Sequence, residues 1–481
     1  MTSHAEGLTA FPYAPMPASR ELRAPLAPNG AVRMSEVISA LSYALDIVEG
    51  QPAGHAVRSC ILGMRIANTI GLDGERLSSL FYALLLKDLG CSSNASKICY
   101  LFGSDDREVK SDFKTVEWNS VAERFKYVVR NSAPTGSIAD RVKHFGRVAL
   151  SGATSTREIV QIRCDRGASI ARALQLSEDT AIAIRNLDEH WDGAGHPDGV
   201  AGDAIPLLAR ILNLAQTVEV FSSRDGLDAA IDMAIARSGT WFDPELVRAM
   251  ATLRGCEVLR ESLVSKSPRS LLHALEPEDR RMVADDATLD RIANAFGMVV
   301  DAKSPWTAAH SQGVSEVAVG IARELGLAPQ DIVKIRRAGL LHDLGKLGIS
   351  NTILDKPGKL DDAELALLRR HPEFTHTMLK HVAAFDSIAE LAASHHERLD
   401  GKGYHRGIEG KDLSPSVRAL VVADMYEALA AHRPYRKDLD EGEVMAILSK
   451  NVLNGGLCPE AFAALQSFLA KSCFVPYKIA A

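Results

Sequence analysis

The chain carries one pattern twice, and this repeat constrains the fold more than any single segment does. In the second half, His310 precedes the pair His342-Asp343. In the first half, His55 precedes Lys87-Asp88 at an identical spacing. Two leucines come before each pair and Leu-Gly follows it. The sequence therefore predicts two copies of one fold.

A second interval downstream supports the same alignment. The separation of Leu187 from Gln216 equals the separation of His395 from Asp424. Between the two matched regions, the first half of the chain is longer than the second. We interpret this difference as an insertion near residues 100–147.

Within both copies, the apolar residues have the spacing of helices. They recur at three- and four-residue intervals, as in the series Val57, Ile61, Met64, Ala67 and Ile70. Alternating strand patterns are hard to find. Gly71 and Gly326 are expected to end two helices, and Pro329 to open the helix that leads to His342. We predict an all-α fold class with two helical bundles in tandem.

Composition divides the chain into four parts. Residues 1–34 are rich in Pro and Ala and lack apolar periodicity, so we expect a flexible arm. The first copy covers residues 35–254, a connector covers 255–284, and the second copy covers 285–481. A chain of 481 residues exceeds what one hydrophobic core usually fills, which favours more than one domain.

Charge and cysteine content exclude several classes of protein. A net charge of -6 and a pI near 6.2 provide no basic field for DNA. The seven cysteines form no C-x-x-C pair, and the N-terminus lacks a signal-peptide pattern. No stretch approaches the roughly 18 apolar residues of a membrane span. We expect a cytoplasmic protein with no membrane anchor and no DNA partner.

The histidines are concentrated in the second copy, where nine of the fifteen lie between His310 and His432. Asp343 can bridge two divalent cations, and the other ligands can complete the two shells. Nitrogen-rich shells favour Fe or Mn, with Zn and Ni as alternatives, over Mg. We predict two metal ions with these ligands: His310, His342, Asp343, His371, His395, His396 and Asp424.

Two such ions suit hydrolysis of a phosphodiester, because they lower the pKa of an attacking water. Lys346 follows the His342-Asp343 pair by about one turn. Its ammonium can neutralise phosphate charge or protonate a leaving oxygen.

The motifs of the second copy resemble those of the HD-GYP family, within the HD superfamily of metal-dependent phosphohydrolases. The resemblance covers roughly residues 285–475 and includes His342–Ile349, His395–Tyr404 and Arg433–Arg436. It implies an all-helical bacterial domain that hydrolyses cyclic di-GMP, or a related cyclic dinucleotide, to linear pGpG and further to GMP.

The resemblance also implies roles for individual residues. The seven predicted ligands match the metal ligands of the family, and Lys346 matches its catalytic lysine, acting beside Asp343. Gly403 and Tyr404 match the motif beside the nucleobase. Arg433 and Arg436 match the basic pair that holds phosphate, a role suited to bidentate guanidinium groups.

The sequence departs from the family pattern at several positions. His405 stands where the family has proline, which predicts a less rigid loop. Leu399 replaces a tryptophan, and residues 430–432 are less polar than in the family. Trp306 occupies the position at which members with three metals carry glutamate. Since an indole cannot bind a cation, we predict a binuclear site.

The first copy has lost most of the corresponding ligands. An ammonium about 4 Å from a divalent ion would be repelled by roughly 8 kcal/mol at an effective dielectric constant of 20. We therefore predict no dinuclear centre here and expect a degenerate copy used for dimerisation or sensing. A homodimer or a signalling protein is the expected partner, with the insertion as a candidate surface. The replacements are Lys87 for His342, Arg163 for His371, Leu187-Asp188 for His395-His396, Gln216 for Asp424 and Cys91 for Lys346.

Three functions follow from these observations. The first is a cyclic-dinucleotide phosphodiesterase regulated by its inactive copy. The second is a non-catalytic cyclic di-GMP receptor, suggested by the altered Tyr404-His405 loop. The third is another HD-type reaction, such as a nucleotide 5′-phosphatase or a di-iron oxygenase. Lys346 and the Gly403-Tyr404 motif argue against the third.

Overall fold

The computed structural model describes residues 32–116, 120–265, 271–272, 274–278, 281–307, 309–431 and 439–472. Within these ranges the chain forms α-helices and short 3₁₀ helices and no named strand, which confirms the predicted all-α class. The predicted arm lies almost entirely outside the described residues. Among the described residues, no helix is both long enough and apolar enough to cross a membrane.

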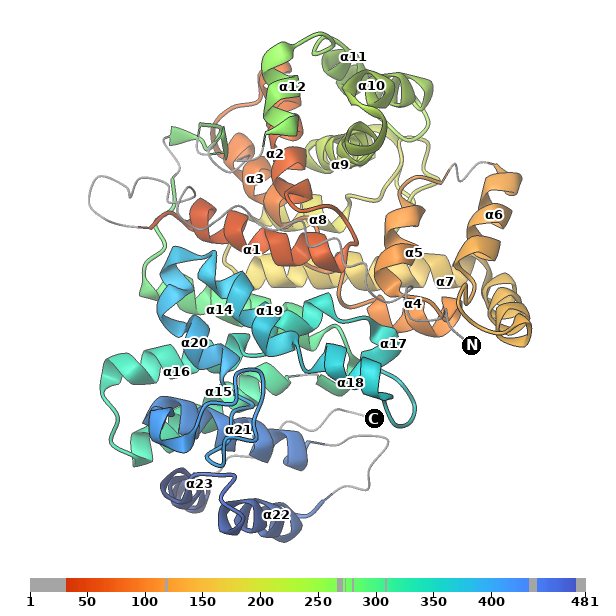
Figure 1. Ribbon diagram of the computed structural model, residues 1–481. Helices are drawn as coiled ribbons and strands as arrows, with labels where there is room; N and C mark the ends of the chain where they lie inside the picture. Colours follow the sequence, from red (N-terminus) through yellow and green to blue (C-terminus); the bar gives the residue numbers. More distant parts are fainter. Residues whose placement is uncertain are drawn as a thin grey trace.

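The first copy occupies the upper half of Figure 1. His55 opens one of its helices, and Lys87 directly follows another. Gly71 follows the first of these with a left-handed φ of 73°, as predicted for a helix-ending glycine. The helices are α1 (Met34–Val48), α2 (His55–Thr69), α3 (Gly74–Leu86), α8 (Glu178–Arg185), α9 (Leu207–Asp225), α10 (Leu227–Ala236) and α11 (Pro244–Ala251). Helix α12 (Glu257–Val264) follows them, within the range 255–284 that the sequence predicts to be a connector.

The segment predicted as an insertion forms a lobe at the right of Figure 1. It has a small apolar cluster of its own, which includes Leu101, Val109 and Tyr127. The lobe contains α4 (Ala95–Phe102), α5 (Asp106–Phe113), α6 (Val121–Asn131) and the first part of α7 (Ile138–Ala173). Gly152, with φ of 62°, interrupts α7 between the lobe and the body.

The second copy fills the lower half of Figure 1. Pro329 opens α16 as predicted, and Gly326 follows α15 with φ of 68°. The principal helices are α14 (Asp286–Asp301), α15 (His310–Glu324), α16 (Pro329–Leu341), α19 (His371–Lys380), α20 (Asp386–Ala393), α21 (Pro415–Ala430), α22 (Glu441–Leu453) and α23 (Pro459–Lys471). Shorter elements are η3 (Pro305–Thr307), η4 (Leu344–Gly348), α17 (Asn351–Leu354) and α18 (Asp362–Leu368).

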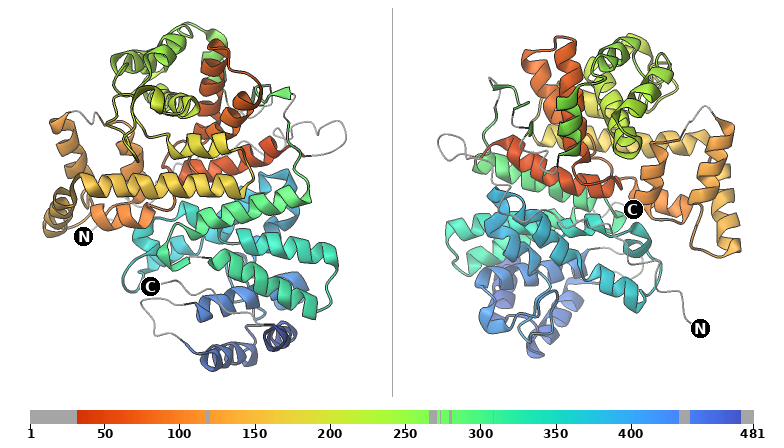
Figure 2. Two further views of the ribbon diagram at one scale, coloured as in Figure 1. Left: turned by 180° about the vertical axis from the view of Figure 1, so that it is seen from behind. Right: turned by 45° about the horizontal axis from the view of Figure 1, so that its top comes forward.

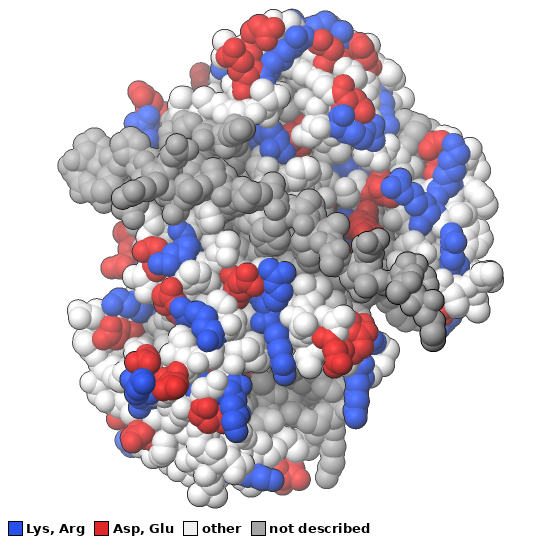
Figure 3. Space-filling view, viewed as in Figure 1, with Lys and Arg blue, Asp and Glu red and all other residues white. Residues whose placement is uncertain are grey.

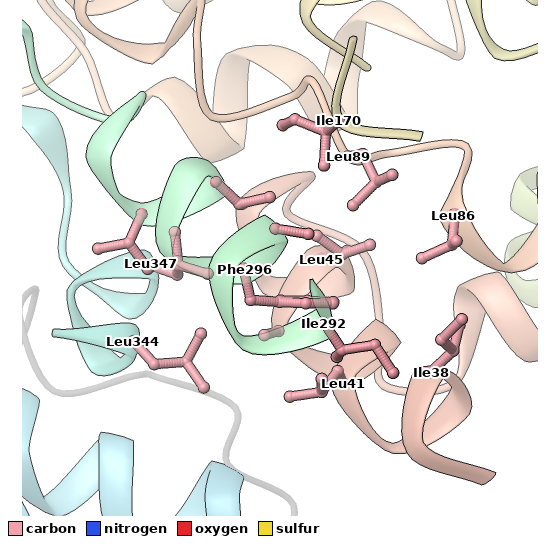
Figure 4. Close-up of a cluster of buried hydrophobic side chains, with 14 of the residues drawn as sticks. Ile38, Leu41, Leu45, Leu86, Leu89, Ile170, Ile292, Phe296, Leu344 and Leu347 are labelled. Atoms are coloured by element: carbon pink, nitrogen blue, oxygen red, sulfur yellow. The ribbon is translucent and has the colours of Figure 1, made fainter. Parts of the chain in front are cut away.

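The two copies share one continuous hydrophobic core. Helix α1 of the first copy lies between the halves, and its Leu41 and Leu45 are buried beside Phe296 of α14 (Figure 4). Leu344 and Leu347 of η4 belong to the same cluster. Seen from behind, α7 and α14 run side by side across the junction (Figure 2). Removing either copy would expose this apolar surface, which costs about 25 cal/mol per Å².

Charged side chains are distributed without a dominant sign on the face shown in Figure 3. Lysine and arginine alternate with aspartate and glutamate over both copies there. Among the described residues on this face, no continuous basic area of the kind that DNA binding uses appears. The absence of a DNA partner remains a prediction.

Candidate metal centre

The seven predicted ligands come together in the second copy, most of them at helix ends. His310 begins α15, and the pair His342-Asp343 follows α16. His371 begins α19, the pair His395-His396 follows α20, and Asp424 lies within α21. All except His396 are buried.

Asp343 lies at the centre of the cluster and divides it into two sets. Its Oδ2 atom lies 3.2 Å from Nε2 of His342 and 3.6 Å from Nε2 of His310. Its Oδ1 atom lies 3.3 Å from Nε2 of His371 and 3.7 Å from Nε2 of His395. Each carboxylate oxygen therefore faces a different pair of imidazoles, as a carboxylate that bridges two cations requires.

Asp424 connects the same two sets from the opposite side. Its Oδ1 atom lies 3.4 Å from Nε2 of His310 and 3.7 Å from Nε2 of His342. Its Oδ2 atom lies 3.8 Å from Nδ1 of His396. His371, His395 and His396 have ligand atoms within 4.8 Å of one another, as do His310, His342 and Asp343.

Backbone carbonyls orient three of the imidazoles. Nδ1 of His342 lies 2.8 Å from the carbonyl oxygen of Gly339. His371 and His395 make the same contact at 2.7 Å with the carbonyl three residues earlier. With Nδ1–H donating to the carbonyl, the Nε2 lone pair of each ring points into the cluster, which is the usual arrangement of metal-binding histidine.

Two atoms of the cluster also point to a cation. Nε2 of His342 and Oδ1 of Asp343 are buried and have no hydrogen-bond partner among the described residues. An unsatisfied buried polar atom costs about 1–3 kcal/mol, and a bound cation would satisfy both. The donor set therefore fits the two predicted divalent ions.

Burial also affects the protonation of two of the predicted ligands. It lowers the pKa of His371 and of His396 to about 3, so both rings are neutral and can bind a metal. Burial alone would raise the pKa of Asp343. The positive charge of Lys346 beside this carboxylate acts against burial, and the pKa of Asp343 lies well below its usual range.

Lys346 lies in η4, directly beside the centre. Its Nζ is 2.5 Å from Oδ2 of Asp343, and its side chain remains partly exposed. Gly345, the residue before it, allows η4 to approach α19 closely. A Cβ at this position would lie 2.0 Å from the carbonyl oxygen of His371. The Leu-Gly of the motif is thus required by packing.

The Gly403-Tyr404 loop borders the centre on the side of His396. The ring centroid of Tyr404 lies 4.6 Å from that of His396, and Arg369 lies 5.6 Å from the Tyr404 centroid. The buried carboxylate of Glu397 holds the loop by accepting hydrogen bonds from backbone N–H groups further along it. Arg433 and Arg436 lie outside the described residues.

Sequence reasoning missed two contacts that support the ligands. Glu427, one turn beyond Asp424, pairs through its carboxylate with Nδ1 of His310. Thr375 donates to the carbonyl of His342 at 2.8 Å. The repeat contains a signal for the first contact, because the first copy has a glutamate at the position equivalent to Glu427.

In the first copy, basic side chains occupy the corresponding space. Nζ of Lys87 lies 2.8 Å from Nε2 of His55 and pairs with Asp88. Nζ of Lys114 lies 3.0 Å from Glu49. Glu49, Asp88 and Cys91 are of types that can bind a metal. The ammonium groups of Lys87 and Lys114 already neutralise the two carboxylates. This arrangement supports the prediction that the copy has no dinuclear centre.

The packing of the first copy also supports the alignment of Arg163 with His371. A Cβ on Gly90 would lie 1.9 Å from the carbonyl oxygen of Arg163. Gly345 makes the equivalent close approach to His371 in the second copy. The guanidinium of Arg163 pairs with Asp188, which stands at the position of His396.

Comparison with known proteins gives the same class. A family model described as HD domain matches residues 149–246 and 294–455. An all-helical fold with histidine and aspartate ligands at helix ends defines a metal-dependent phosphohydrolase of the HD superfamily. The chain belongs to this superfamily, and within it to the HD-GYP type. The two matched segments fall in the two copies that the repeat predicts.

Individual relatives cover different shares of the chain. A 3′3′-cGAMP-specific phosphodiesterase of Vibrio cholerae is 42% identical over 436 residues, which are 91% of this chain and 94% of the relative. A cyclic di-GMP phosphodiesterase of Pseudomonas aeruginosa is 36% identical over 37% of this chain and 43% of its own length. The crystal structure of a V. cholerae cyclic GMP-AMP-specific phosphodiesterase matches with a TM-score of 0.60 and 37% identity, over 92% of this chain and 99% of that one.

Proposed function

We propose that the chain is a phosphodiesterase that hydrolyses a cyclic dinucleotide to a linear product. The observation that carries this proposal is the position of the Asp343 carboxylate. Its two oxygens face two separate pairs of imidazoles, and Lys346 lies beside it. A receptor needs no such paired ligand set next to a partly exposed ammonium group. The full-length relatives with this activity support the same reading.

Residues of the second copy would hold two divalent ions, Fe or Mn first. His310, His342 and Asp424 would hold one ion and His371, His395 and His396 the other, with Asp343 between them. When bound, such ions polarise a phosphodiester and lower the pKa of the water that attacks it. The neutral state of His371 and His396 keeps their nitrogens available for this role.

The remaining residues would act on the substrate directly. The ammonium of Lys346 neutralises the charge that develops on phosphate and can deliver a proton to the leaving oxygen. Tyr404 offers an aromatic face for a nucleobase next to His396. Arg433 and Arg436, by resemblance, hold the second phosphate.

Among cyclic dinucleotides, we propose 3′3′-cGAMP as the first candidate substrate and cyclic di-GMP as the second. The V. cholerae relative that is named for 3′3′-cGAMP matches nearly the whole chain, including the first copy. The P. aeruginosa relative named for cyclic di-GMP matches 183 residues, which are 37% of this chain. We assign a regulatory role to the first copy.

The test is anaerobic incubation of the full chain, loaded separately with Fe(II) or Mn(II), with each of the two cyclic dinucleotides. Linear products are followed by chromatography beside the variant Asp343→Ala. Metal-dependent product that disappears in the variant supports the phosphodiesterase and ranks the substrates. Nucleotide binding without product, at two metals per chain, would instead establish the receptor function that the altered Tyr404-His405 loop suggested.

A further inference from the structure

Helix α5, in the lobe of the first copy, contacts the turn that carries Lys346 in the second. The guanidinium Nη1 of Arg107 donates to the carbonyl oxygen of Gly348 at 2.9 Å. Gly348 is the last residue of η4, and the N–H of Ile349 donates back to the carbonyl of Lys346 at 3.0 Å. A side chain of the degenerate copy thus holds the end of the turn that presents the predicted catalytic lysine.

The neighbouring Asp106 joins two further segments of the second copy. Its fully buried carboxylate lies 3.7 Å from Nζ of Lys303 and 3.5 Å from the backbone N of Asn351. The side-chain amide of Asn351 donates to the carbonyl of Lys303 at 2.7 Å. Lys303 precedes His310 and Asn351 follows Lys346, so Asp106 ties together the chain on both sides of the metal centre.

Burial raises the cost of breaking the pair between Asp106 and Lys303. Lys303 is 1% exposed, and its Nζ has no hydrogen-bond partner among the described residues. Burial lowers the pKa of Lys303 to about 8, and the opposite charge of Asp106 acts against that shift. Because water is excluded from this contact, losing the carboxylate would leave a buried ammonium without compensation.

Helix α5 is itself fixed within the first copy. Nζ of Lys110 donates to the carbonyl of Cys91 at 2.7 Å and pairs with Asp106 at 3.0 Å. Asp105 orients the side chain of Arg107, because the Asp105 carboxylate accepts a hydrogen bond from Nε of Arg107 at 3.0 Å. Helix α1 of the same copy packs its apolar face against η4 (Figure 4). The turn therefore contacts α1 and α5 of the first copy in addition to α19 of its own copy.

We infer that Arg107 and Asp106 of the first copy are positioning residues for Lys346 of the second. The copy that has lost its own ligands holds η4 in the geometry in which the ammonium meets Asp343. Displacement of a catalytic group by about 1 Å can cost about 10²-fold in rate. The expected effect on kcat rests on the proposed function. The expected effect on hydrogen exchange of η4 does not.

The decisive variant is Arg107→Gln in the full chain loaded with Mn(II). We expect kcat to fall by about tenfold or more, with KM within about twofold of wild type, unchanged metal content and an unchanged Tm. Hydrogen exchange of residues 344–351 should become faster while exchange elsewhere stays the same. Arg107→Lys, which keeps a donor for the Gly348 carbonyl, should recover most of kcat.

The matched control is Arg130→Gln in the same lobe, whose side chain is 77% exposed and pairs only with Asp112 among the described residues. It should leave kcat and exchange unchanged. A milder second variant, Asp105→Asn, keeps the helix cap but weakens the pairing that aims Arg107. It should lower kcat in the same direction by a smaller factor.

Unchanged kcat and unchanged exchange in Arg107→Gln would overturn the inference. A loss of kcat that appears only together with lost metal or a lower Tm would overturn it as well, because the contact would then serve stability alone. If the wild-type chain has no turnover, the proposed function fails, and faster exchange at residues 344–351 in Arg107→Gln still supports the positioning contact.

Discussion

The Nζ atom of Lys87 lies 2.8 Å from Nε2 of His55, and it also pairs with Asp88. In the second copy the equivalent histidine and aspartate, His310 and Asp343, instead face the space predicted for a cation. One ammonium group thus replaces a metal ion as the positive charge between an imidazole and a carboxylate. The replacement lets the first copy keep its helical frame without a metal.

Lys87→Met tests this replacement by its effect on stability. The substitution leaves Asp88 buried without its closest cation, and breaking such a pair costs about 3–5 kcal/mol. We expect the free energy of unfolding in urea to fall by that amount, while metal content stays at two ions per chain. Lys126→Met, at a side chain that is 71% exposed, is the control and should change stability little. A third bound metal would contradict this account of the first copy.

Metal removal gives a second prediction. Asp343→Ala takes away both oxygens that face the imidazole pairs, so we expect neither ion to bind with wild-type affinity. Elemental analysis after gel filtration should show the loss, together with the loss of turnover. Retention of both ions by Asp343→Ala would contradict the bridging role.

Lys346→Met separates the chemical step from metal binding. The ammonium lies against Asp343 but is not a ligand, so both metals should remain bound. Loss of a general acid lowers kcat by about 10²–10⁴-fold. Steady-state kinetics beside Lys411→Met, at a side chain that is 74% exposed, measures the effect. A fall in metal content equal to the fall in kcat would count against a role in catalysis.

Parts of the fold and of the candidate site could be predicted from the sequence, because their signals lie in short stretches of the chain. The residues predicted as metal ligands are recognisable because histidine and aspartate are chemically specific and recur in a fixed frame. The helical class follows from the spacing of the apolar residues, and the opening of α16 at Pro329 follows from residue type. Each of these signals lies within a few residues of the feature that it predicts.

Other features depend on contacts between distant segments, which periodicity does not reveal. The apolar face of α1 predicts burial, but it does not predict that Leu41 and Leu45 lie beside Phe296 of the other copy. The pairing of Arg107 with Gly348 joins residues 241 positions apart. Lys114 enters the former metal site from the lobe, so alignment of the two copies could not indicate it.

The contact of Glu427 with His310 also joins distant segments, but the repeat indicates it, because the first copy has a glutamate at the equivalent position. The Glu427 carboxylate pairs with Nδ1 of His310 and is 1% exposed. This contact orients the ring and makes Nε2 a better ligand. The carboxylate at the equivalent position of the first copy, Glu219, pairs in the same way with His55. The pairing therefore belongs to the common frame.

Glu427→Gln keeps the shape of the side chain but removes its charge. We expect metal affinity or kcat to fall by about 10–100-fold, as for other groups that support a metal ligand. The ion held by His310 should be affected before the one held by His371, because Glu427 contacts only the first of these rings. Titration of metal-free protein with Mn(II), beside the exposed control Glu409→Gln, distinguishes the two sites. Equal weakening of both ions would mean that Glu427 supports the bundle rather than one ligand.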